Sequence, residues 1–129
     1  MIHFGLIGCG HWGKNYIRVL KELKSSHLVA CCEANVEYLK SIQKNNQDIE
    51  WYGDHRDLLK NQTIKIVVVA TPPKSHFEIV KNCLEAGKHV IAEKPLTLTI
   101  GECEELFNLA NRKKLKLLVG YTFLFNSAI

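Results

Sequence analysis

The sequence predicts an α/β domain with a doubly wound parallel sheet, and two observations predict it. Short apolar segments alternate six times with segments of helical periodicity along the 129 residues, which is the pattern of consecutive strand–helix units. The first apolar segment, 2–7, also runs directly into a glycine-rich turn over 8–13, as the first strand of such a sheet does. Since crossovers between parallel strands are right-handed, we expect six strands in the order 3-2-1-4-5-6, with helices on both faces.

The chain begins with a strand and a helix joined by the glycine turn. Residues 2–7 place hydrophobic side chains on both faces of a strand, as expected for a central parallel strand. The helix that follows runs to about Lys24. Its expected buried stripe falls at helical spacing on Tyr16, Ile17, Leu20 and Leu23. The apolar segment 28–32 is the second strand.

The middle of the chain contains two further strands of unequal strength. A helix over about 36–45 has few apolar residues, and Trp51-Tyr52 form a short third strand before a brief helical turn at about 56–60. The fourth strand, 64–70, has the clearest pattern because it is rich in β-branched residues. It stops at Thr71-Pro72-Pro73, where proline cannot continue a ladder.

Two strand–helix pairs complete the sheet. A helix opens near Ser75 and ends before Gly87, a residue suited to the left-handed conformation that stops helices. Residues 89–92 form the fifth strand. Thr99 and Glu102 have the spacing of a capping box for a helix to about Arg112, and residues 115–120 form the sixth strand.

The spacing G-x-G-x-x-G in Gly8, Gly10 and Gly13 predicts a dinucleotide-binding Rossmann domain. Gly8 permits the tight turn, Gly10 lets a pyrophosphate approach the backbone, and Gly13 lets the helix pack closely on its strand. The unpaired N–H groups at the start of the helix, together with its dipole, favour the anion. A turn that binds nothing is the alternative. The dinucleotide interpretation also requires an acidic residue about twenty positions on, and Glu33 stands 20 residues after Gly13.

Glu33 also predicts which dinucleotide is bound. Its carboxylate can accept both hydroxyl groups of the adenosine ribose, and it would repel the 2′-phosphate of NADP. The residues that follow, Ala34, Asn35 and Val36, supply no cation to offset that repulsion. The sequence therefore favours NAD over NADP. The alternative interpretation of Glu33 is a solvated carboxylate at the end of a strand.

Three further features reach the carboxyl edge of the sheet, where ligands of such domains bind. Thr71 and Pro72 would lie beside the nicotinamide half of the cofactor. His76 follows just inside the next helix, either as a cofactor contact or as a structural hydrogen-bonding residue. Lys94, fixed by Pro95, could hydrogen-bond a substrate hydroxyl and stabilise the oxygen charge that develops as hydride leaves. The other interpretation of Lys94 is a structural ion pair with Glu93.

The composition excludes several other classes of protein. A content of 47% hydrophobic and 23% charged residues is that of an ordinary globular domain, and the excess of basic residues is not interleaved with aromatic ones, so nucleic acid is not an expected partner. The longest apolar run, 66–70, is too short for a membrane span, and we expect no secretory signal, since Met1 leads straight into a short strand. The five cysteines lack C-x-x-C spacing, so neither disulfides nor a metal site is expected. We therefore expect a cytoplasmic protein with no membrane partner.

Three segments together resemble the Gfo/Idh/MocA oxidoreductase family: the glycine turn 8–15, Ala70-Thr71-Pro72-Pro73 with His76, and 86–96 with Glu93-Lys94-Pro95. The resemblance covers the whole chain. It implies that Lys94 is the catalytic lysine between the nicotinamide and the reacting sugar carbon, with Tyr121 at the start of the substrate pocket. The cofactor contacts it implies are Gly8, Gly10, His11, Trp12, Gly13, Glu33, Thr71, Pro72, His76, Glu93, Lys94 and Pro95.

The same resemblance implies a substrate class. The turn 10–15 and the ending 119–126 are most similar to family members that oxidise nucleotide-linked sugars, the nucleotide-sugar 3-dehydrogenases. We therefore expect oxidation of a secondary alcohol on a sugar or nucleotide sugar. An S-adenosylmethionine methyltransferase, which also has a glycine-rich first turn, is disfavoured because Glu-Lys-Pro has no role there.

Members of the family carry a second α/β domain after the sixth strand. We expect residues 1–120 to be the NAD-binding domain and 121–129 to start the connection to an absent substrate domain. Because hydride transfer needs a substrate held in near-attack geometry, we expect little turnover from this chain alone. The alternative is a stand-alone NAD-binding or sensing module that acts through a partner protein. The apolar ending 121–129 would normally dock on something, and a homo-oligomer is one such partner.

Overall fold

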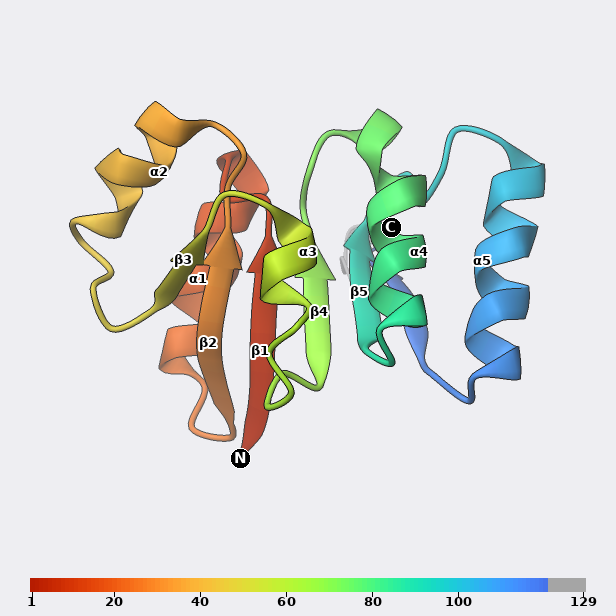
Figure 1. Cartoon of the computed structure of the whole chain (residues 1–129), viewed down its shortest axis with the longest axis horizontal. Coiled ribbons are helices and arrows are strands. Elements are labelled where there is room, and N and C mark those ends of the chain that lie inside the picture. Colours follow the sequence, from red (N-terminus) through yellow and green to blue (C-terminus); the bar gives the residue numbers. More distant parts are fainter. Residues whose placement is uncertain (121–129) are drawn as a thin grey trace, which may run out of the picture.

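The structure is a computed structural model that describes residues 1–120, and its centre is a six-stranded sheet in the order β3-β2-β1-β4-β5-β6 (Figure 1). All neighbouring strands are parallel. The strands are β1 (Ile2–Ile7), β2 (Ser26–Cys32), β3 (Glu50–Tyr52), β4 (Ile66–Val69), β5 (His89–Glu93) and β6 (Leu117–Gly120). The predicted fold class and strand order are confirmed.

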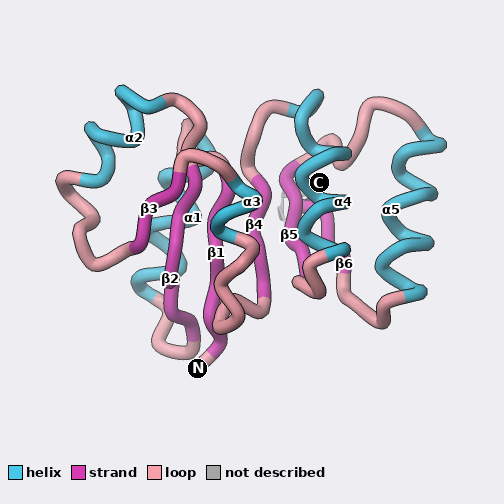
Figure 2. The backbone as a smooth tube through the Cα atoms, in the orientation of Figure 1, coloured by secondary structure: helices cyan, strands magenta, loops and turns pink. Residues whose placement is uncertain are grey.

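Each of the first five strands is followed by a helix that returns the chain to the start of the next strand. The helices are α1 (His11–Glu22), α2 (Val36–Gln43), α3 (His55–Leu58), α4 (His76–Glu85) and α5 (Ile100–Arg112), with a 3-10 turn, η1 (Pro73–Ser75), before α4. Because all neighbouring strands are parallel, the loops that leave their carboxyl ends gather along one edge of the sheet (Figure 2). Within residues 1–120, none of these helices has the length and apolar character needed to span a membrane.

Two hydrophobic clusters bury the two faces of the sheet. On β4, Val67 and Val69 belong to the cluster that packs under α3, α4 and α5, whereas Val68 belongs to the cluster under α1. This alternation follows from the period of two along a strand. Because both faces are covered, the central strands read as continuous apolar runs rather than as alternating ones.

Two predicted helix ends are confirmed by their local geometry. The Thr99 hydroxyl accepts the backbone N–H of Glu102 at 3.2 Å, so Thr99 caps the start of α5, and it donates to the Glu102 carboxylate at 3.1 Å. Gly87 follows α4 with a φ of 79°, the left-handed conformation that glycine adopts most easily.

One predicted core residue is wrong. Leu23 was expected on the buried stripe of the first helix, but its side chain is 50% exposed. The helix ends at Glu22, and Leu23 has extended backbone angles of −73° and 123°, so its side chain leaves the helical stripe. Ile17 and Leu20 of the same stripe are buried as predicted, and Tyr16 is half-buried.

Candidate functional site

A cleft of about 790 Å³ opens at the carboxyl edge of the sheet, where the chain crosses from the β1–β2–β3 half to the β4–β5–β6 half. This reversal of strand order is the position at which doubly wound sheets bind ligands. Nine of the predicted site residues line the cleft: Gly8, Gly10, His11, Trp12, Glu33, Thr71, Pro72, Glu93 and Lys94. Gly13, His76 and Pro95 are not among the described residues that line it, and Tyr121 lies outside the described residues.

The three glycines of the turn meet different steric demands. A Cβ atom at Gly13 would stand 2.2 Å from the carbonyl oxygen of Gly8, and one at Gly8, whose φ is 94°, would stand 2.7 Å from the carbonyl carbon of Ala70. At Gly10, by contrast, no described atom lies within 4 Å of the Cβ position. Gly8 and Gly13 are therefore required by the fold itself, whereas Gly10 keeps space open on the side of the cleft.

The start of α1 is suited to an anion. Gly10 is its N-cap residue, and among the described residues no side chain caps the helix or places a carboxylate in its first turn. The first backbone N–H groups of a helix have no partner within the helix and carry its positive dipole end. Open amides beside an unhindered Gly10 fit the pyrophosphate of a dinucleotide.

Glu33 lies in the cleft at the end of β2 and is held by two backbone amides. Its Oε1 accepts the N–H of Cys9 at 3.1 Å, and its Oε2 accepts the N–H of Asn35 at 2.8 Å. Asn35 then caps α2, since its side chain accepts the N–H of Tyr38 at 3.0 Å. The Tyr38 hydroxyl returns to the glycine turn and donates to the carbonyl oxygen of Cys9 at 2.7 Å. The carboxylate is thus fixed beside the turn rather than left as a freely solvated group.

The turn that carries Lys94 follows β5 on the other half of the cleft. Lys94 is exposed, whereas the preceding Glu93 is only 8% exposed. The hydroxyl of Tyr16, on α1, donates to Oε1 of Glu93. Burial and the nearby Glu93 carboxylate raise the pKa of Tyr16 above its ordinary value.

His76 links two loops of the site from behind the cleft. Its side chain is fully buried, at 0% exposure, with Nδ1 2.8 Å from the carbonyl oxygen of Pro95 and Nε2 2.7 Å from that of Thr71. The ring therefore connects the loop after β4 with the loop after β5. In this position His76 shapes the cleft through these two loops.

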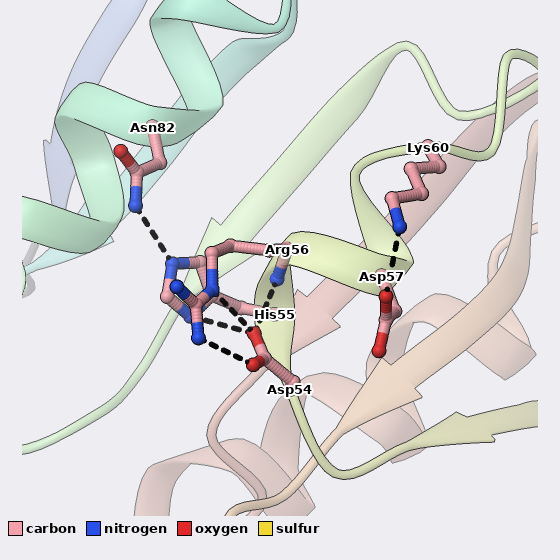
Figure 3. A network of polar contacts seen from close by, with 6 residues as sticks. All are labelled: Asp54, His55, Arg56, Asp57, Lys60 and Asn82. Carbon is pink, nitrogen blue, oxygen red and sulfur yellow. Dashed lines mark hydrogen bonds and ion pairs between the residues drawn. The ribbon is translucent and has the colours of Figure 1, made fainter.

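Sequence reasoning missed the loop after β3, which contributes Asp54, His55 and Arg56 to the cleft (Figure 3). The Arg56 guanidinium donates to both carboxylate oxygens of Asp54, at 3.0 and 2.7 Å, and holds the pKa of Asp54 well below its usual range. Asp54 also caps α3 by accepting the N–H of Arg56 at 2.9 Å. Nε2 of His55 lies 3.0 Å from the side-chain nitrogen of Asn82 on α4.

One signal could have found this loop. It follows a strand, and every strand of a parallel sheet delivers its carboxyl end to the same edge. An aspartate immediately before a helical turn is a typical N-cap, which places the Asp54 carboxylate at that edge. The side-chain partners of His55 and Arg56, however, depend on tertiary structure.

The comparisons with known proteins agree with this geometry. A family model described as an oxidoreductase family with a NAD-binding Rossmann fold matches residues 2–121. An uncharacterised oxidoreductase of Synechocystis is 30% identical over 120 residues, which are 93% of this chain and 32% of that protein. The D-apiose dehydrogenase of Paraburkholderia graminis is 27% identical over 124 residues, 96% of this chain and 33% of that protein.

A solved structure of a dehydrogenase has the same fold as this chain. The scyllo-inositol dehydrogenase of Lactobacillus casei, crystallised with NAD(H) and scyllo-inositol, superimposes with a TM-score of 0.89 at 25% identity, over 99% of this chain and 38% of that one. The chain therefore spans about a third of the length of the relatives it matches.

Proposed function

The chain belongs to the Gfo/Idh/MocA family of oxidoreductases, and from that premise we propose that it is the cofactor domain of an enzyme that oxidises a secondary alcohol of a sugar or nucleotide sugar with NAD. One observation carries the proposal. A single cleft at the switch point of the sheet brings together the open start of α1, the fixed carboxylate of Glu33 and the exposed Lys94. These are an anion site, a ribose site and a cation at the end of a strand.

The cofactor would extend across both halves of the sheet, with different residues of the cleft contacting each part. The start of α1 with Gly10, His11 and Trp12 would hold the pyrophosphate, and Glu33 would accept the ribose hydroxyls of adenosine. Thr71 and Pro72, from the loop after β4, would lie beside the nicotinamide half together with Glu93. When bound, NAD supplies a hydride acceptor.

Lys94 would be the residue of this chain that touches the substrate. Its ammonium group would donate a hydrogen bond to the hydroxyl that is oxidised and stabilise negative charge on that oxygen, as the hydride passes to NAD and the hydroxyl proton passes to a general base. Gly8 and Gly13 would support the turn, while His76 and Pro95 would hold the loops of the nicotinamide side. Turnover would also require a wall that holds the substrate against Lys94, so we expect this chain alone to be inactive.

The substrate class rests on the relatives. D-apiose dehydrogenase and scyllo-inositol dehydrogenase both bear the names of polyhydroxylated compounds, which supports a sugar-like substrate. Nucleotide-linked sugars, with Tyr121 as a substrate contact, are the narrower form of the proposal. A cytoplasmic location belongs to the proposal as well, and the free thiol state of all five cysteines supports it.

Measuring the preference for NAD over NADP is the most direct test of the proposed function. Calorimetric titration of this chain should give saturable NAD binding, at least about tenfold tighter than that of NADP because Glu33 repels the 2′-phosphate. Glu33→Gln should weaken NAD binding and narrow the preference. Glu50→Gln removes an exposed carboxylate from β3, outside the cleft lining, and should change neither affinity. If the wild-type chain bound neither dinucleotide, the proposal would be wrong.

A further inference from the structure

Two side chains hold the turn that carries Lys94, one from each face of the sheet. Tyr16 of α1 donates to the carboxylate of Glu93, the residue before Lys94. His76 of α4 lies 2.8 Å from the carbonyl oxygen of Pro95, the residue after it. The helices α1 and α4 cover opposite faces of the sheet, since they pack on different hydrophobic clusters. Lys94 therefore lies between two anchored neighbours.

The contact between Tyr16 and Glu93 joins segments that are 77 residues apart in sequence. Glu93 is a nearly buried carboxylate, and a buried charge is stable only when it is hydrogen-bonded. Gly120, opposite Glu93 on β6, leaves room for it, because a Cβ atom there would stand 3.1 Å from Oε1 of Glu93. The carboxylate thus lies against Gly120 on one side and accepts the Tyr16 hydroxyl through the same oxygen.

The Tyr16 hydroxyl remains protonated and can therefore always donate its hydrogen bond to Glu93. The pKa of its hydroxyl lies above the ordinary value because of burial and the Glu93 carboxylate, so the proton stays on Tyr16 throughout the physiological range. Tyr16 is not among the described residues that line the cleft, whereas Glu93 and Lys94 are. The Tyr16 hydroxyl therefore reaches the cleft through its hydrogen-bond partner Glu93.

We propose that Tyr16 is a positioning residue whose hydroxyl fixes Glu93 and thereby the turn that presents Lys94 to the nicotinamide half of the cofactor. This inference rests on the proposed function, because it assumes that the cleft binds NAD. It assigns Tyr16 to the nicotinamide half only. The adenosine half is held by Glu33 and the glycine turn, which are linked through Cys9 and do not include Tyr16.

The test compares NAD with ADP, which keeps the adenosine and both phosphate groups but lacks the nicotinamide and its ribose. Tyr16→Phe removes the hydroxyl and keeps the aromatic ring of the side chain. It should reduce the NAD affinity of the 129-residue chain by about tenfold, the scale of one hydrogen bond to a charged group, and leave the ADP affinity unchanged. The matched control is Tyr52→Phe, which removes a tyrosine hydroxyl that donates to Glu50 at 3.0 Å, outside the cleft lining. It should change neither affinity.

The outcomes separate the inference from the proposed function. If Tyr16→Phe lowers both affinities equally, or neither, Tyr16 does not position the nicotinamide half and the inference is overturned. If the wild-type chain binds neither ligand, the proposed function fails first. Should Tyr16→Phe not fold, Tyr16→Met, which also removes the hydroxyl, provides the same comparison. It keeps Glu93 but removes the donor to it, and it should lower the affinity for NAD without changing that for ADP. Equal loss for both ligands would again overturn the inference.

Discussion

The carboxylate of Glu33 accepts the backbone N–H of Cys9 at 3.1 Å, although the two residues are 24 positions apart. The contact joins the end of β2 to the middle of the glycine turn, so the candidate ribose site and the candidate phosphate site form one hydrogen-bonded unit. The Tyr38 hydroxyl adds a second link to Cys9. A dinucleotide would therefore meet a site whose adenosine half is organised before it binds, which lowers the entropic cost of binding.

The glycine turn gives the first prediction, a comparison of one substitution at two positions. Gly13→Ala places a Cβ atom 2.2 Å from the carbonyl oxygen of Gly8 and should lower the free energy of unfolding by about 2 kcal/mol or more. Gly10→Ala meets no described atom within 4 Å, so its effect on stability should be much smaller, but it should weaken NAD binding by roughly tenfold because the new methyl group faces the pyrophosphate.

Urea unfolding and NAD titration of both variants check this separation. Each substitution serves as the control for the other, since both add the same methyl group to the same turn. Equal losses of stability, or an unchanged NAD affinity in Gly10→Ala, would contradict the assignment of Gly10 to the ligand side.

A second prediction concerns acid stability and Asp54. Because Arg56 lowers the pKa of Asp54 in the folded protein, the pair stabilises the fold above the unfolded-state pKa of about 3.9 and loses that effect as the pH falls through the lower, folded-state value. Asp54→Asn keeps a good N-cap for α3 but loses the charge. The variant should be less stable than wild type at pH 7, and the difference should shrink as the pH falls below about 4.

Urea midpoints measured from pH 7 down to pH 2 test this. Arg56→Gln, which removes the other partner, should show the same convergence at low pH. A difference that stays constant across the range would mean that the pairing of Asp54 with Arg56 does not stabilise the fold.

The sequence was sufficient for the fold and for placing nine of the residues that line the cleft, for identifiable reasons. The strand order follows from local patterns and the crossover rule, and Glu33 and Lys94 lie at strand ends, whose position such a sheet dictates. The contacts of Tyr16 with Glu93 and of Arg56 with Asp54 were not foreseen. Both contacts depend on the direction in which a side chain leaves its helix or loop. The contact of Tyr16 also depends on the fold, because its partner lies 77 positions away in the chain.

His76 shows where a sequence pattern leaves two roles open. Its position near a helix start fits either a cofactor contact or a structural hydrogen bond, and the ring lies fully buried between two carbonyl groups. At Leu23 the sequence pattern indicates a single role, a buried position, and that prediction is wrong. Its spacing fits the buried stripe of α1, but the helix ends one residue earlier, and the boundary of a helix is the feature that periodicity specifies least.

A third prediction follows from the burial of His76. His76→Ala removes a fully buried ring and leaves the carbonyl groups of Thr71 and Pro95 without this partner, so the free energy of unfolding should fall by roughly 2–4 kcal/mol. NAD binding should weaken as well, because the two loops lose their connection. The control is His27→Ala, at an exposed position of β2, which should change stability by less than about 0.5 kcal/mol. Chemical denaturation that shows equal effects for the two variants would contradict the structural role of His76.

The last prediction separates catalysis from folding at Lys94. Because Lys94 is exposed, Lys94→Ala should change the free energy of unfolding by no more than about 0.5 kcal/mol. In a form of the protein joined to a substrate domain, the same substitution should lower kcat for sugar oxidation by about 10²–10³-fold, as expected when a donor to the developing oxyanion is removed. NADH production followed by absorbance measures the effect. Lys74→Ala, at an exposed position of η1 outside the cleft lining, is the control and should retain full activity. If oxidation persisted in Lys94→Ala, the catalytic role of Lys94 would be wrong. A biological function that survived the substitution while NAD binding was retained would instead favour a binding or sensing module.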